Sequence, residues 1–345
     1  MNLKVYMEKP NPKNYDKELL LELYRKLWQC RAFDASVIRM VSEGKIKGFY
    51  HAGSGEEAIG VGSCTQLRDD DYIFYMHRGC NEMIAKGVPV DLLYGDFFGT
   101  MHSTNKGLGA GTIHSAYPEK GVLGQPGTIG TNSILGVGVG LSIKYRKTDQ
   151  VCICYFGDGT AARELLHGAL NWSGLYKLPV IFMCENNEFG LSNPYKNSHD
   201  INQYIAEYAT GYANVESVVV DGNNVLAVKE VSDAAIARAR RGDGPTFIEA
   251  KTYRHKGHFV GDPTVYRDKV RDEWFINHDD PVYNFKSQLL ACEIASESEL
   301  DAIEAKVKEE DTKASDVAYA APMPTKDRIY EGLFSEGKEV LTCRK

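Results

Sequence analysis

The sequence predicts an α/β fold in which a parallel sheet is flanked by helices and extended by further helices at both ends of the chain. From residue 130 onward, short apolar runs alternate with segments of helical periodicity. Apolar runs without polar alternation are typical of parallel strands that are buried on both faces. The composition, 43% hydrophobic and 25% charged, is that of a globular protein and excludes a disordered or fibrous chain.

The first part of the chain is expected to be mainly helical. Residues 1–15 are polar and contain proline, so we expect an arm. Residues 16–44 place apolar side chains at three- and four-residue steps, which predicts a long amphipathic helix. A second helix should begin near Glu56, and residues 71–87 read as an extended piece that turns into a helix. Residues 103–128 form a long glycine-rich loop, and such loops inside compact proteins are usually functional.

The second part alternates strands with helices, an order that implies right-handed crossovers in one parallel sheet. In chain order we expect a helix over 130–146, a strand over 151–156, a helix over 162–176, a strand over 179–184, a strand over 218–220, a helix over 224–241 and a strand over 246–250. The tail, 281–345, reads as two or three surface helices. Although 345 residues would allow two domains, there is no internal repeat or low-complexity linker. We therefore predict one α/β domain over 16–345, with C-terminal helices from about 281.

Charge and cysteine content exclude several classes of protein. Forty basic and 47 acidic residues give a net charge of −7 without a basic cluster, which disfavours nucleic-acid binding. The eight cysteines contain no CxxC pair and are expected to be reduced core residues. The first residues lack the apolar core of a signal peptide, and no uninterrupted apolar window of 18 residues predicts a membrane helix. We expect a cytoplasmic protein that does not bind membranes.

Two neighbouring strand ends carry polar residues suited to chemistry. The strand over 151–156 is followed by Gly157-Asp158-Gly159-Thr160 and then a helix, whose first N–H groups suit a phosphate. A carboxylate beside a phosphate requires a bridging cation, and Mg²⁺ binds both kinds of oxygen. The next strand ends in Glu185-Asn186-Asn187-Glu188, where an amide and a backbone carbonyl could supply neutral oxygen ligands.

Either motif alone is weak evidence for a ligand site. Together, with 26 residues between Gly159 and Asn186, the two motifs are typical of thiamine diphosphate enzymes. The stretch GDGTAARELLHGALNWSGLYKLPVIFMCENNEFGLS resembles the alpha chain of the decarboxylating component of 2-oxo acid dehydrogenases. Pyruvate, branched-chain and acetoin dehydrogenase alpha subunits belong to that family. The resemblance extends over about residues 17–320 and includes GFYHAGSGEEAIGVG, HRG, the loop ending GTIH, GQPGTIGTNSILGVGVGL and TYRHKGHFVGDPTVYR.

The resemblance implies the thiamine diphosphate-binding fold, in its diphosphate-binding form, and assigns site residues. Magnesium would be held by Asp158, Asn187 and the carbonyl of Phe189. The residues that the resemblance assigns to the cofactor are His77, Arg78, Gly127, Ile129, Asp158, Gly159, Thr160, Asn187, Arg254 and His258.

The implied roles differ between these residues. Gly159 and Thr160 would offer backbone N–H groups to the diphosphate. Arg78 and Arg254 would pair with its oxygens, for which a guanidinium fork is well suited, and His77 stands at a phosphate-contact position. Gly127 and Ile129 would contact the aminopyrimidine through their backbone, and Ile129 would help to enforce the bent cofactor. His258 matches the active-site histidine, and His114 is a second catalytic candidate.

Family members also need a glutamate that activates the aminopyrimidine, and this chain has no region resembling the domain that carries it. The resemblance therefore implies a beta subunit that supplies the glutamate, in an α2β2 heterotetramer. The expected activity is decarboxylation of a small 2-oxo acid such as pyruvate, with transfer of the acyl group to a lipoyl acyltransferase. Glu56 could lie near the subunit interface, although we expect it to serve in packing.

Three departures from the family pattern keep other activities open. Cys80 replaces a histidine, Arg163 follows an unusual GDGTAA sequence, and Phe259 stands where regulated relatives carry a serine. One alternative is acetoin cleavage, or a carboligase-like transfer of the acyl group to an aldehyde. A non-enzymatic scaffold is disfavoured, because a scaffold would not need the charged residues of the motifs. An unrelated nucleotide-binding fold is disfavoured because no GxGxxG or GxxxxGK motif follows a strand.

Overall fold

A six-stranded, entirely parallel sheet forms the centre of the protein in a computed structural model that describes residues 3–109 and 114–331. The strand order is β1-β7-β8-β4-β3-β2. The strands are β1 (Leu3–Tyr6), β2 (Tyr72–Phe74), β3 (Cys152–Gly157), β4 (Val180–Asn186), β7 (Glu216–Asp221) and β8 (Thr246–Lys251), with a separate antiparallel pair of β5 (Phe189–Gly190) and β6 (Asn193–Pro194). The predicted α/β class with a parallel sheet is confirmed.

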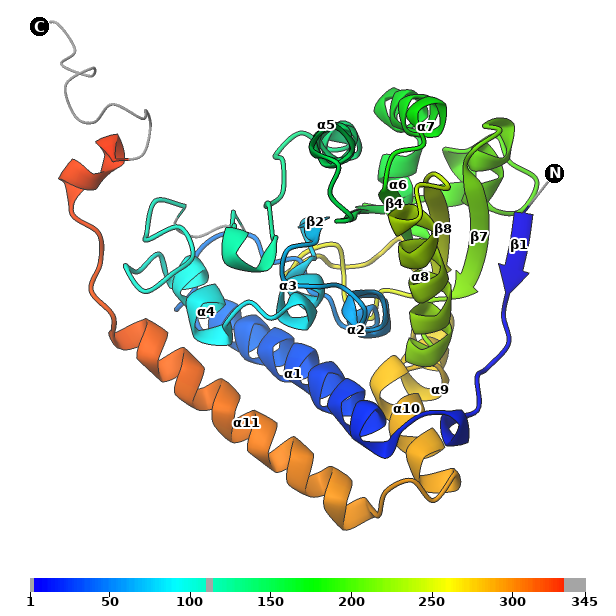
Figure 1. The fold of residues 1–345 in the computed structure, drawn as a ribbon. Helices are drawn as coiled ribbons and strands as arrows, with labels where there is room; N and C mark the ends of the chain where they lie inside the picture. Colours follow the sequence, from blue (N-terminus) through cyan, green and yellow to red (C-terminus); the bar gives the residue numbers. More distant parts are fainter. Residues whose placement is uncertain (1–2, 110–113, 332–345) are drawn as a thin grey trace, which may run out of the picture.

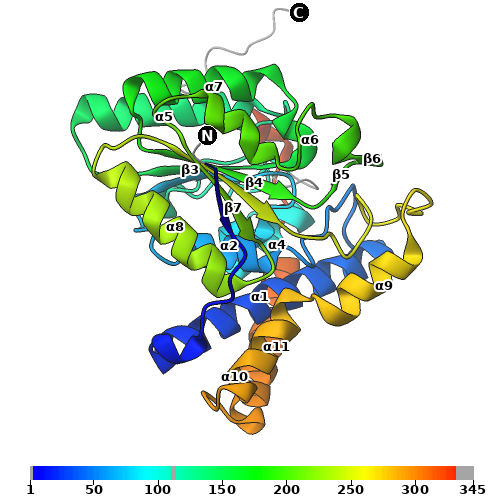
Figure 2. The same ribbon diagram turned by 90° about the vertical axis from the view of Figure 1, so that its right-hand side faces the viewer.

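Helices cover both faces of this sheet and extend it (Figures 1 and 2). They are α1 (Lys17–Ser42), α2 (Glu57–Cys64), α3 (Cys80–Lys86), α4 (Val90–Phe98), α5 (Thr131–Arg146), α6 (Asp158–Ala161), α7 (Glu164–Tyr176), α8 (Val225–Arg240), α9 (Lys269–His278), α10 (Pro281–Ala291) and α11 (Glu297–Ala320). Short 3₁₀ helices lie at Pro12–Asn14, Pro118–Lys120, Tyr195–Asn197, Ile205–Gly211 and Lys326–Tyr330.

Alternate residues of each central strand face two different hydrophobic cores. In β3, Cys152, Cys154 and Phe156 pack toward the α5 and α7 layer. Ile153 and Tyr155 pack into the larger core on the opposite face, which includes α1, α2 and α8. Both faces of the strand are therefore buried, which explains the uninterrupted apolar run in its sequence.

Helix α5 contains small residues because it lies directly on the sheet. A Cβ atom added at Gly136 would lie 2.1 Å from the Sγ atom of Cys154, and one at Gly140 would lie 2.7 Å from a methyl carbon of Val180. Only glycine leaves room for this approach, so the glycine-rich sequence fixes the position of the helix that follows the long loop.

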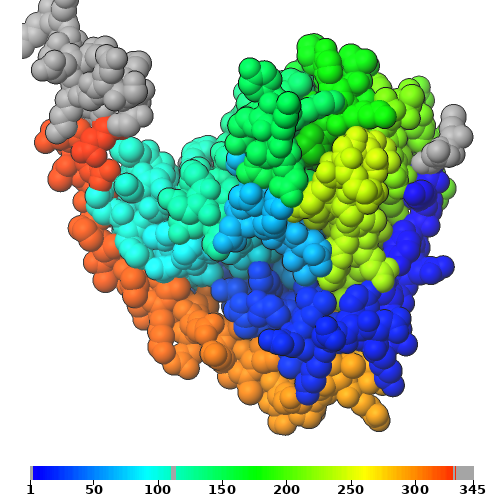
Figure 3. All heavy atoms as spheres, viewed as in Figure 1, coloured from blue at the N-terminus to red at the C-terminus, as the bar shows by residue number. Residues whose placement is uncertain are grey.

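The helical extensions pack against the first helix. Asp311 of α11 accepts hydrogen bonds from Ser36 of α1 and from Tyr94 of α4, at 2.7 and 2.8 Å. In the space-filling view, α11 forms an orange band along the lower edge of the molecule (Figure 3). Because α11 packs on α1 and α4, we propose that the helical extensions and the sheet belong to one domain.

Several details differ from the expectations. The expected N-terminal arm contains β1, an edge strand that pairs with β7 from Leu3↔Ser217 onward. The helix expected over 162–176 is preceded by a separate turn, α6, and begins after Arg163, whose backbone is extended. Helices α4 and α9 were not predicted; α9 buries none of its residues, which explains its weak periodicity. Among the described residues, no helix is long and apolar enough to cross a membrane.

Candidate functional site

The site lies at the carboxyl ends of β3 and β4, which are neighbours in the sheet. Gly157 pairs with Glu185, so the residues that follow these two strands emerge at the same edge. Asp158 is buried, and its Oδ1 accepts a hydrogen bond from the backbone N–H of Gly159 at 2.8 Å. Its Oδ2 is also buried and has no hydrogen-bond partner among the described residues. Burial raises the pKa of Asp158 to about 7. An orphaned carboxylate oxygen of this kind suits a cation.

Two further oxygen donors lie beside this carboxylate. The side-chain nitrogen of Asn187 donates to Oε1 of Glu56 at 3.0 Å, and its side-chain oxygen accepts from the backbone N–H of Phe189 at 3.3 Å. The carbonyl of Phe189 accepts from Arg254 at 3.3 Å. A carboxylate, an amide oxygen and a backbone carbonyl form the hard oxygen donor set that Mg²⁺ prefers.

The turn after β3 and the segment after β4 approach each other closely. A Cβ atom added at Gly159 would lie 2.9 Å from the Cα atom of Gly190. Gly159 is exposed and Thr160 is half-buried at the first turn of α6. Since any larger residue would collide with backbone, this glycine keeps the two segments in contact at the place where the diphosphate is expected.

Two buried guanidinium groups face the same region. Arg78 donates to the carbonyl of Ala52 at 3.0 Å and to the carbonyl of His258 at 2.9 Å. Arg254 donates to the carbonyl of Leu191 at 3.2 Å as well as to Phe189. Burial lowers the pKa of Arg78 to about 10, against the opposing effect of the Glu56 carboxylate. Buried positive charge beside free hydrogen-bonding capacity favours an anion such as a diphosphate.

Three imidazole rings form a compact cluster next to Arg78. The candidate ligand nitrogens of His51, His77 and His258 all lie within 4.8 Å of one another. His51 Nδ1 lies 2.7 Å from the carbonyl of His258 and must donate to it. Nδ1 of His258 lies 3.0 Å from an Nη atom of Arg78, which can only donate, so the proton of His258 is on Nε2.

The histidine cluster is uncharged at neutral pH. Burial, followed by the positive charge of Arg78, lowers the pKa of His258 to about 3. Burial also lowers the pKa of His51, and it holds the pKa of His77 well below the usual range. Nε2 of His77 is buried and has no partner among the described residues. The cluster therefore offers neutral donors and acceptors to a ligand.

The loop before α5 lines a small cavity beside this cluster. Tyr75, His77, Ile129 and Thr160 contribute to its walls, and Gly127 is exposed next to it. Ile129 is 56% exposed. Among the described residues, no carboxylate lines this cavity.

The other predicted positions are less closely connected with the site. His114 is exposed and makes no hydrogen bond to the other predicted site residues in the part of the chain that the structure describes. Residues 110–113 of the glycine-rich loop lie outside the described residues. Cys80 is buried at the start of α3, Arg163 lies 3.5 Å from Glu164, and the ring of Phe259 packs edge-on against Phe49. Neither the burial of Cys80 nor the contacts of Arg163 and Phe259 explain why these positions depart from the family pattern.

Sequence analysis did not assign His51 or Glu56 to the site. Both lie within the GFYHAGSGEEAIGVG stretch that contributed to the resemblance, which was the available signal. Nε2 of His199 lies 3.0 Å from the carbonyl of Asp158, where it supports the turn. His255 and His102 face Asp280 and Asp91, at 3.6 and 2.7 Å.

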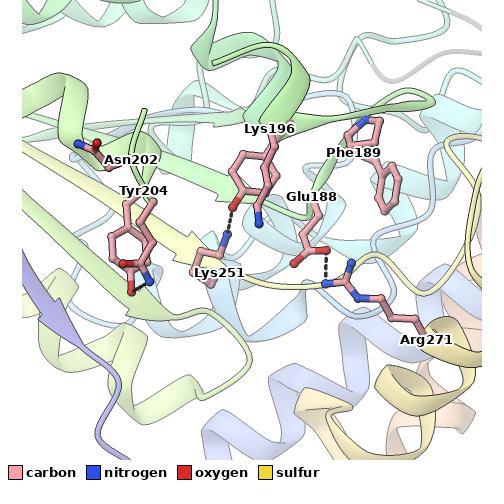
Figure 4. Close-up of a pocket in the computed structure, with 10 residues that line it drawn as sticks. Glu188, Phe189, Lys196, Asn202, Tyr204, Lys251 and Arg271 are labelled. Atoms are coloured by element: carbon pink, nitrogen blue, oxygen red, sulfur yellow. Dashed lines mark hydrogen bonds and ion pairs between the residues drawn. The ribbon is translucent and has the colours of Figure 1, made fainter. Parts of the chain in front are cut away.

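A separate cavity of about 410 Å³ lies beyond β4 and β8 (Figure 4). Glu188 points toward Arg271 and pairs with it at 2.5 Å, while Lys251 points toward the hydroxyl of Tyr195 at 3.5 Å. Phe189 lines this cavity, whereas its carbonyl accepts from Arg254. The ion pair thus links the segment that supplies a candidate metal ligand to α9.

Comparisons with known proteins agree over nearly the whole chain. The family model described as dehydrogenase E1 component matches residues 25–327. The chain is 36% identical over 318 residues to the alpha subunit of acetoin:2,6-dichlorophenolindophenol oxidoreductase of Bacillus subtilis (strain 168), covering 92% of this chain and 94% of the relative. It is 33% identical over 327 residues to the mitochondrial pyruvate dehydrogenase E1 alpha subunit of Dictyostelium discoideum, covering 92% and 83%. A pyruvate dehydrogenase E1 alpha subunit of Zymomonas mobilis subsp. mobilis is 32% identical over 329 residues, covering 94% and 91%.

Proposed function

The chain belongs to the dehydrogenase E1 component family, and from this premise we propose that it is the alpha subunit of a thiamine diphosphate-dependent 2-oxo acid dehydrogenase. Its reaction is the decarboxylation of a small 2-oxo acid such as pyruvate. The acyl group then passes to the lipoyl group of a partner acyltransferase. The observation that carries this proposal is the donor set of Asp158, Asn187 and Phe189, which lies beside buried arginines at one edge of the sheet.

The residues of this chain fit the diphosphate half of the cofactor. Asp158, Asn187 and the carbonyl of Phe189 would hold Mg²⁺, because Asp158 has a buried oxygen without a partner and the other two are neutral oxygen donors. Arg78 and Arg254 would neutralise the diphosphate, with Gly159 and Thr160 offering backbone groups. Bound by these residues, thiamine diphosphate would supply a nucleophilic carbon and an electron sink for decarboxylation.

Arg78 prepares His258 for a role at the reacting carbonyl. Because Arg78 donates to Nδ1, the proton of His258 is held on Nε2, and the ring is neutral. A neutral N–H donor can orient a carbonyl oxygen or stabilise the negative charge that develops on it. His77 and His51 line the same space. We propose no comparable role for His114, because it has no contact with this cluster among the described residues.

The aminopyrimidine half of the cofactor requires a second subunit. Gly127 and Ile129 would contact it, but the cavity beside them has no carboxylate among the described residues. We propose that a beta subunit supplies the activating glutamate in an α2β2 heterotetramer. The active site would then be shared between the two chains.

A second candidate substrate is acetoin. The identity to the Bacillus subtilis acetoin oxidoreductase subunit, 36%, is higher than that to the Dictyostelium discoideum pyruvate dehydrogenase subunit, 33%. The same cofactor chemistry would cleave acetoin by the reverse of a carbon–carbon bond formation. The differences at Cys80, Arg163 and Phe259 are compatible with either substrate.

The test uses the chain assembled with a beta subunit from the same organism. Binding of thiamine diphosphate in Mg²⁺ is measured by calorimetry, and turnover of pyruvate, branched 2-oxo acids and acetoin is followed with an artificial electron acceptor. We expect tight cofactor binding in wild type and none in Asp158→Ala. Turnover of acetoin alone would favour the second substrate, and equal cofactor binding in both proteins would contradict the proposed site.

A further inference from the structure

The cavity of about 410 Å³ beyond β4 and β8 carries an excess of positive charge (Figure 4). Lys196, Lys251 and Arg271 line it, whereas Glu188 is its one carboxylate among the described residues. The three cations come from three different elements, which are the 3₁₀ helix Tyr195–Asn197, the end of β8 and α9. The chain as a whole has a net charge of −7, so this cavity is a local exception. A concave site lined by one sign of charge concentrates ligands of the opposite sign.

The charge of Lys251 is only weakly compensated within the chain. Its ammonium group lies 3.6 Å from the carboxylate of Glu249, which already accepts hydrogen bonds from Asn186 at 2.7 Å and from the backbone N–H of Ala206 at 2.8 Å. Burial raises the pKa of Glu249, which reduces the negative charge beside Lys251. The same ammonium group lies 4.5 Å from the centroid of the Tyr195 ring. A half-buried ammonium group without a close ion pair is costly unless an anion reaches it.

Lys196 and Arg271 provide further capacity for an anion. Lys196 is exposed, and it forms no ion pair within residues 3–109 and 114–331. Arg271 pairs with Glu188 at 2.5 Å, and its guanidinium group packs 5.5 Å from the rings of Tyr253 and Phe275. The side chain of Arg271 is 46% exposed. A ligand that enters the cavity can therefore compete with Glu188 for this guanidinium group.

Aromatic rings form other walls of the cavity. Phe189, Tyr195 and Tyr204 line it, and Tyr195 is buried. The side-chain nitrogen of Gln203 donates to the hydroxyl of Tyr204 at 2.9 Å, which helps to hold that ring in place. The volume is that of a site for a small molecule. A ligand with a flat ring would thus find apolar surfaces beside the cations.

This cavity is distinct from the candidate diphosphate site. Of the described residues, Asp158, Asn187 and Arg254 are not part of its lining. Phe189 belongs to both sites, because it lines the cavity while its carbonyl accepts from Arg254 at 3.3 Å. The two sites are therefore neighbours that share one short segment of the chain.

We propose that the cavity is a second ligand site, which takes a small phosphate monoester that carries a flat ring. The phosphate meets Lys251 and Lys196, and the ring lies against Tyr204 and Phe189. A metal dication is a poorer occupant, because three cations face a single carboxylate. A neutral ligand is also poorer, because it would leave the charge of Lys251 without an anion. This binding site goes beyond the proposed function and does not depend on it.

A ligand in this cavity acts on the candidate metal site through Glu188, a consequence that does rest on the proposed function. Glu188 has a φ of 76°, which a residue other than glycine adopts only when its contacts hold it there. Its backbone N–H donates to Oδ1 of Asn186 at 3.1 Å, and its carbonyl accepts from the N–H of Tyr195 at 2.9 Å. Its carboxylate is held by Arg271. An anion that draws Arg271 away loosens the segment that carries the Phe189 carbonyl, and so weakens Mg²⁺ binding.

The test measures binding of phenyl phosphate by calorimetry to the chain assembled with a beta subunit. Thiamine diphosphate and Mg²⁺ are present at saturation, so that the candidate diphosphate site is filled. Inorganic phosphate and phenol are probes that lack the ring or the charge. Lys251→Gln and Lys196→Gln each remove one cation, and Lys196 is exposed, so its variant tests the site even if Lys251→Gln does not fold. Lys269→Gln is the matched control, because Lys269 is an exposed cation of α9 that does not line the cavity.

We expect phenyl phosphate to bind about tenfold more tightly than inorganic phosphate, and phenol not to bind. Lys251→Gln should weaken binding of phenyl phosphate by about tenfold or more, as loss of a hydrogen bond to a charged group does. Lys196→Gln should weaken it by about threefold, while Lys269→Gln stays within about twofold. Equal affinity in wild type and both cavity variants would overturn the site. So would binding that occurs only without thiamine diphosphate, and equal affinity for inorganic phosphate would overturn the ligand class.

The link to the metal site is measured by titration with Mn²⁺, followed by electron paramagnetic resonance, with and without phenyl phosphate. Saturating phenyl phosphate should raise the dissociation constant of Mn²⁺ by about fivefold or more, as coupling between two sites does. An unchanged constant would overturn the link. If the complex does not bind thiamine diphosphate at all, the proposed function fails, whereas binding of phenyl phosphate that requires Lys251 still supports the second site.

Discussion

The carboxylate of Glu56 accepts a hydrogen bond from the side-chain nitrogen of Asn187 at 3.0 Å. This bond fixes which way the amide points, so that its oxygen faces the backbone N–H of Phe189 and the candidate metal position. Glu56 is itself buried, which raises the pKa of its carboxyl group, while the charges of nearby Arg78 and Arg254 oppose this effect. A residue that seemed to serve only in packing is thus a positioning residue for a proposed ligand.

Substitution of Glu56 should therefore weaken metal binding without removing a ligand. Loss of such outer contacts typically costs 10- to 100-fold in metal affinity. We expect Glu56→Ala to raise the Mg²⁺ concentration needed for cofactor binding by about that factor, and Glu56→Gln, which keeps an acceptor oxygen, to have a smaller effect. Glu82→Gln is the matched control, since Glu82 is equally buried but does not contact Asn187. Titration with Mn²⁺, followed by electron paramagnetic resonance, measures the affinity directly; equal affinities in all variants would be inconsistent with the positioning role.

Gly159 should not tolerate even one added carbon. The Cβ atom of alanine would lie 2.9 Å from the Cα atom of Gly190, and backbone on both sides would have to move. We expect Gly159→Ala to lower the free energy of unfolding by about 1–3 kcal/mol and to weaken diphosphate binding. Gly211→Ala is the control because its Cβ has no neighbour within 4 Å. Urea unfolding of both variants tests the difference, and equal stability would show that the two segments can separate freely.

Glu82 should make stability depend on pH. Burial raises its pKa from 4.5 to about 7, so at pH 6 it is protonated in the folded chain and ionised in the unfolded chain. Folding then takes up a proton, and the contribution of this group to stability falls as pH rises from about 4.5 to 7. Glu82→Gln removes that dependence, so its stability relative to wild type should improve between pH 5.5 and 8, by on the order of 1–2 kcal/mol. Urea unfolding at the two pH values measures the difference in stability between Glu82→Gln and wild type. If this difference is the same at both pH values, Glu82 is not a buried neutral carboxyl group in the folded chain.

His258 should act without titrating in the working pH range. Its pKa near 3 means that the imidazolium form is populated only in strong acid, so the ring is neutral from pH 5 to 9. We expect His258→Ala to lower kcat by about 10²–10³-fold, as expected for loss of one donor to a developing oxyanion, with cofactor affinity nearly retained. The pKa values in the pH profile of kcat/KM should be the same in wild type and His258→Gln. Disappearance of one limb of the profile in His258→Gln would mean that the histidine titrates and that the assigned tautomer is wrong.

Periodicity was enough to predict the sheet and most helices, because the strands are buried on both faces and α1 has a clear apolar stripe. It was not enough for β1, whose four residues are exposed or half-buried at the sheet edge, or for α9, which buries nothing. The position of the candidate site at the ends of β3 and β4 was predictable from the residues that follow these two strands. The contact of Glu56 with Asn187 was not, since 131 residues separate them and only the folded sheet brings α2 to that edge. The same reason applies to the cluster of His51, His77 and His258, which comes from three separate segments.

The central claim is that Asp158 and Asn187 hold Mg²⁺ for a diphosphate cofactor that is completed by a second subunit. Its most direct test is calorimetric titration of thiamine diphosphate into the assembled complex in the presence and absence of Mg²⁺. Saturable binding that requires Mg²⁺, and that is lost in both Asp158→Ala and Asn187→Ala while the complex stays assembled, is the predicted result. Binding that is independent of Mg²⁺, or unchanged in these two variants, would contradict the account.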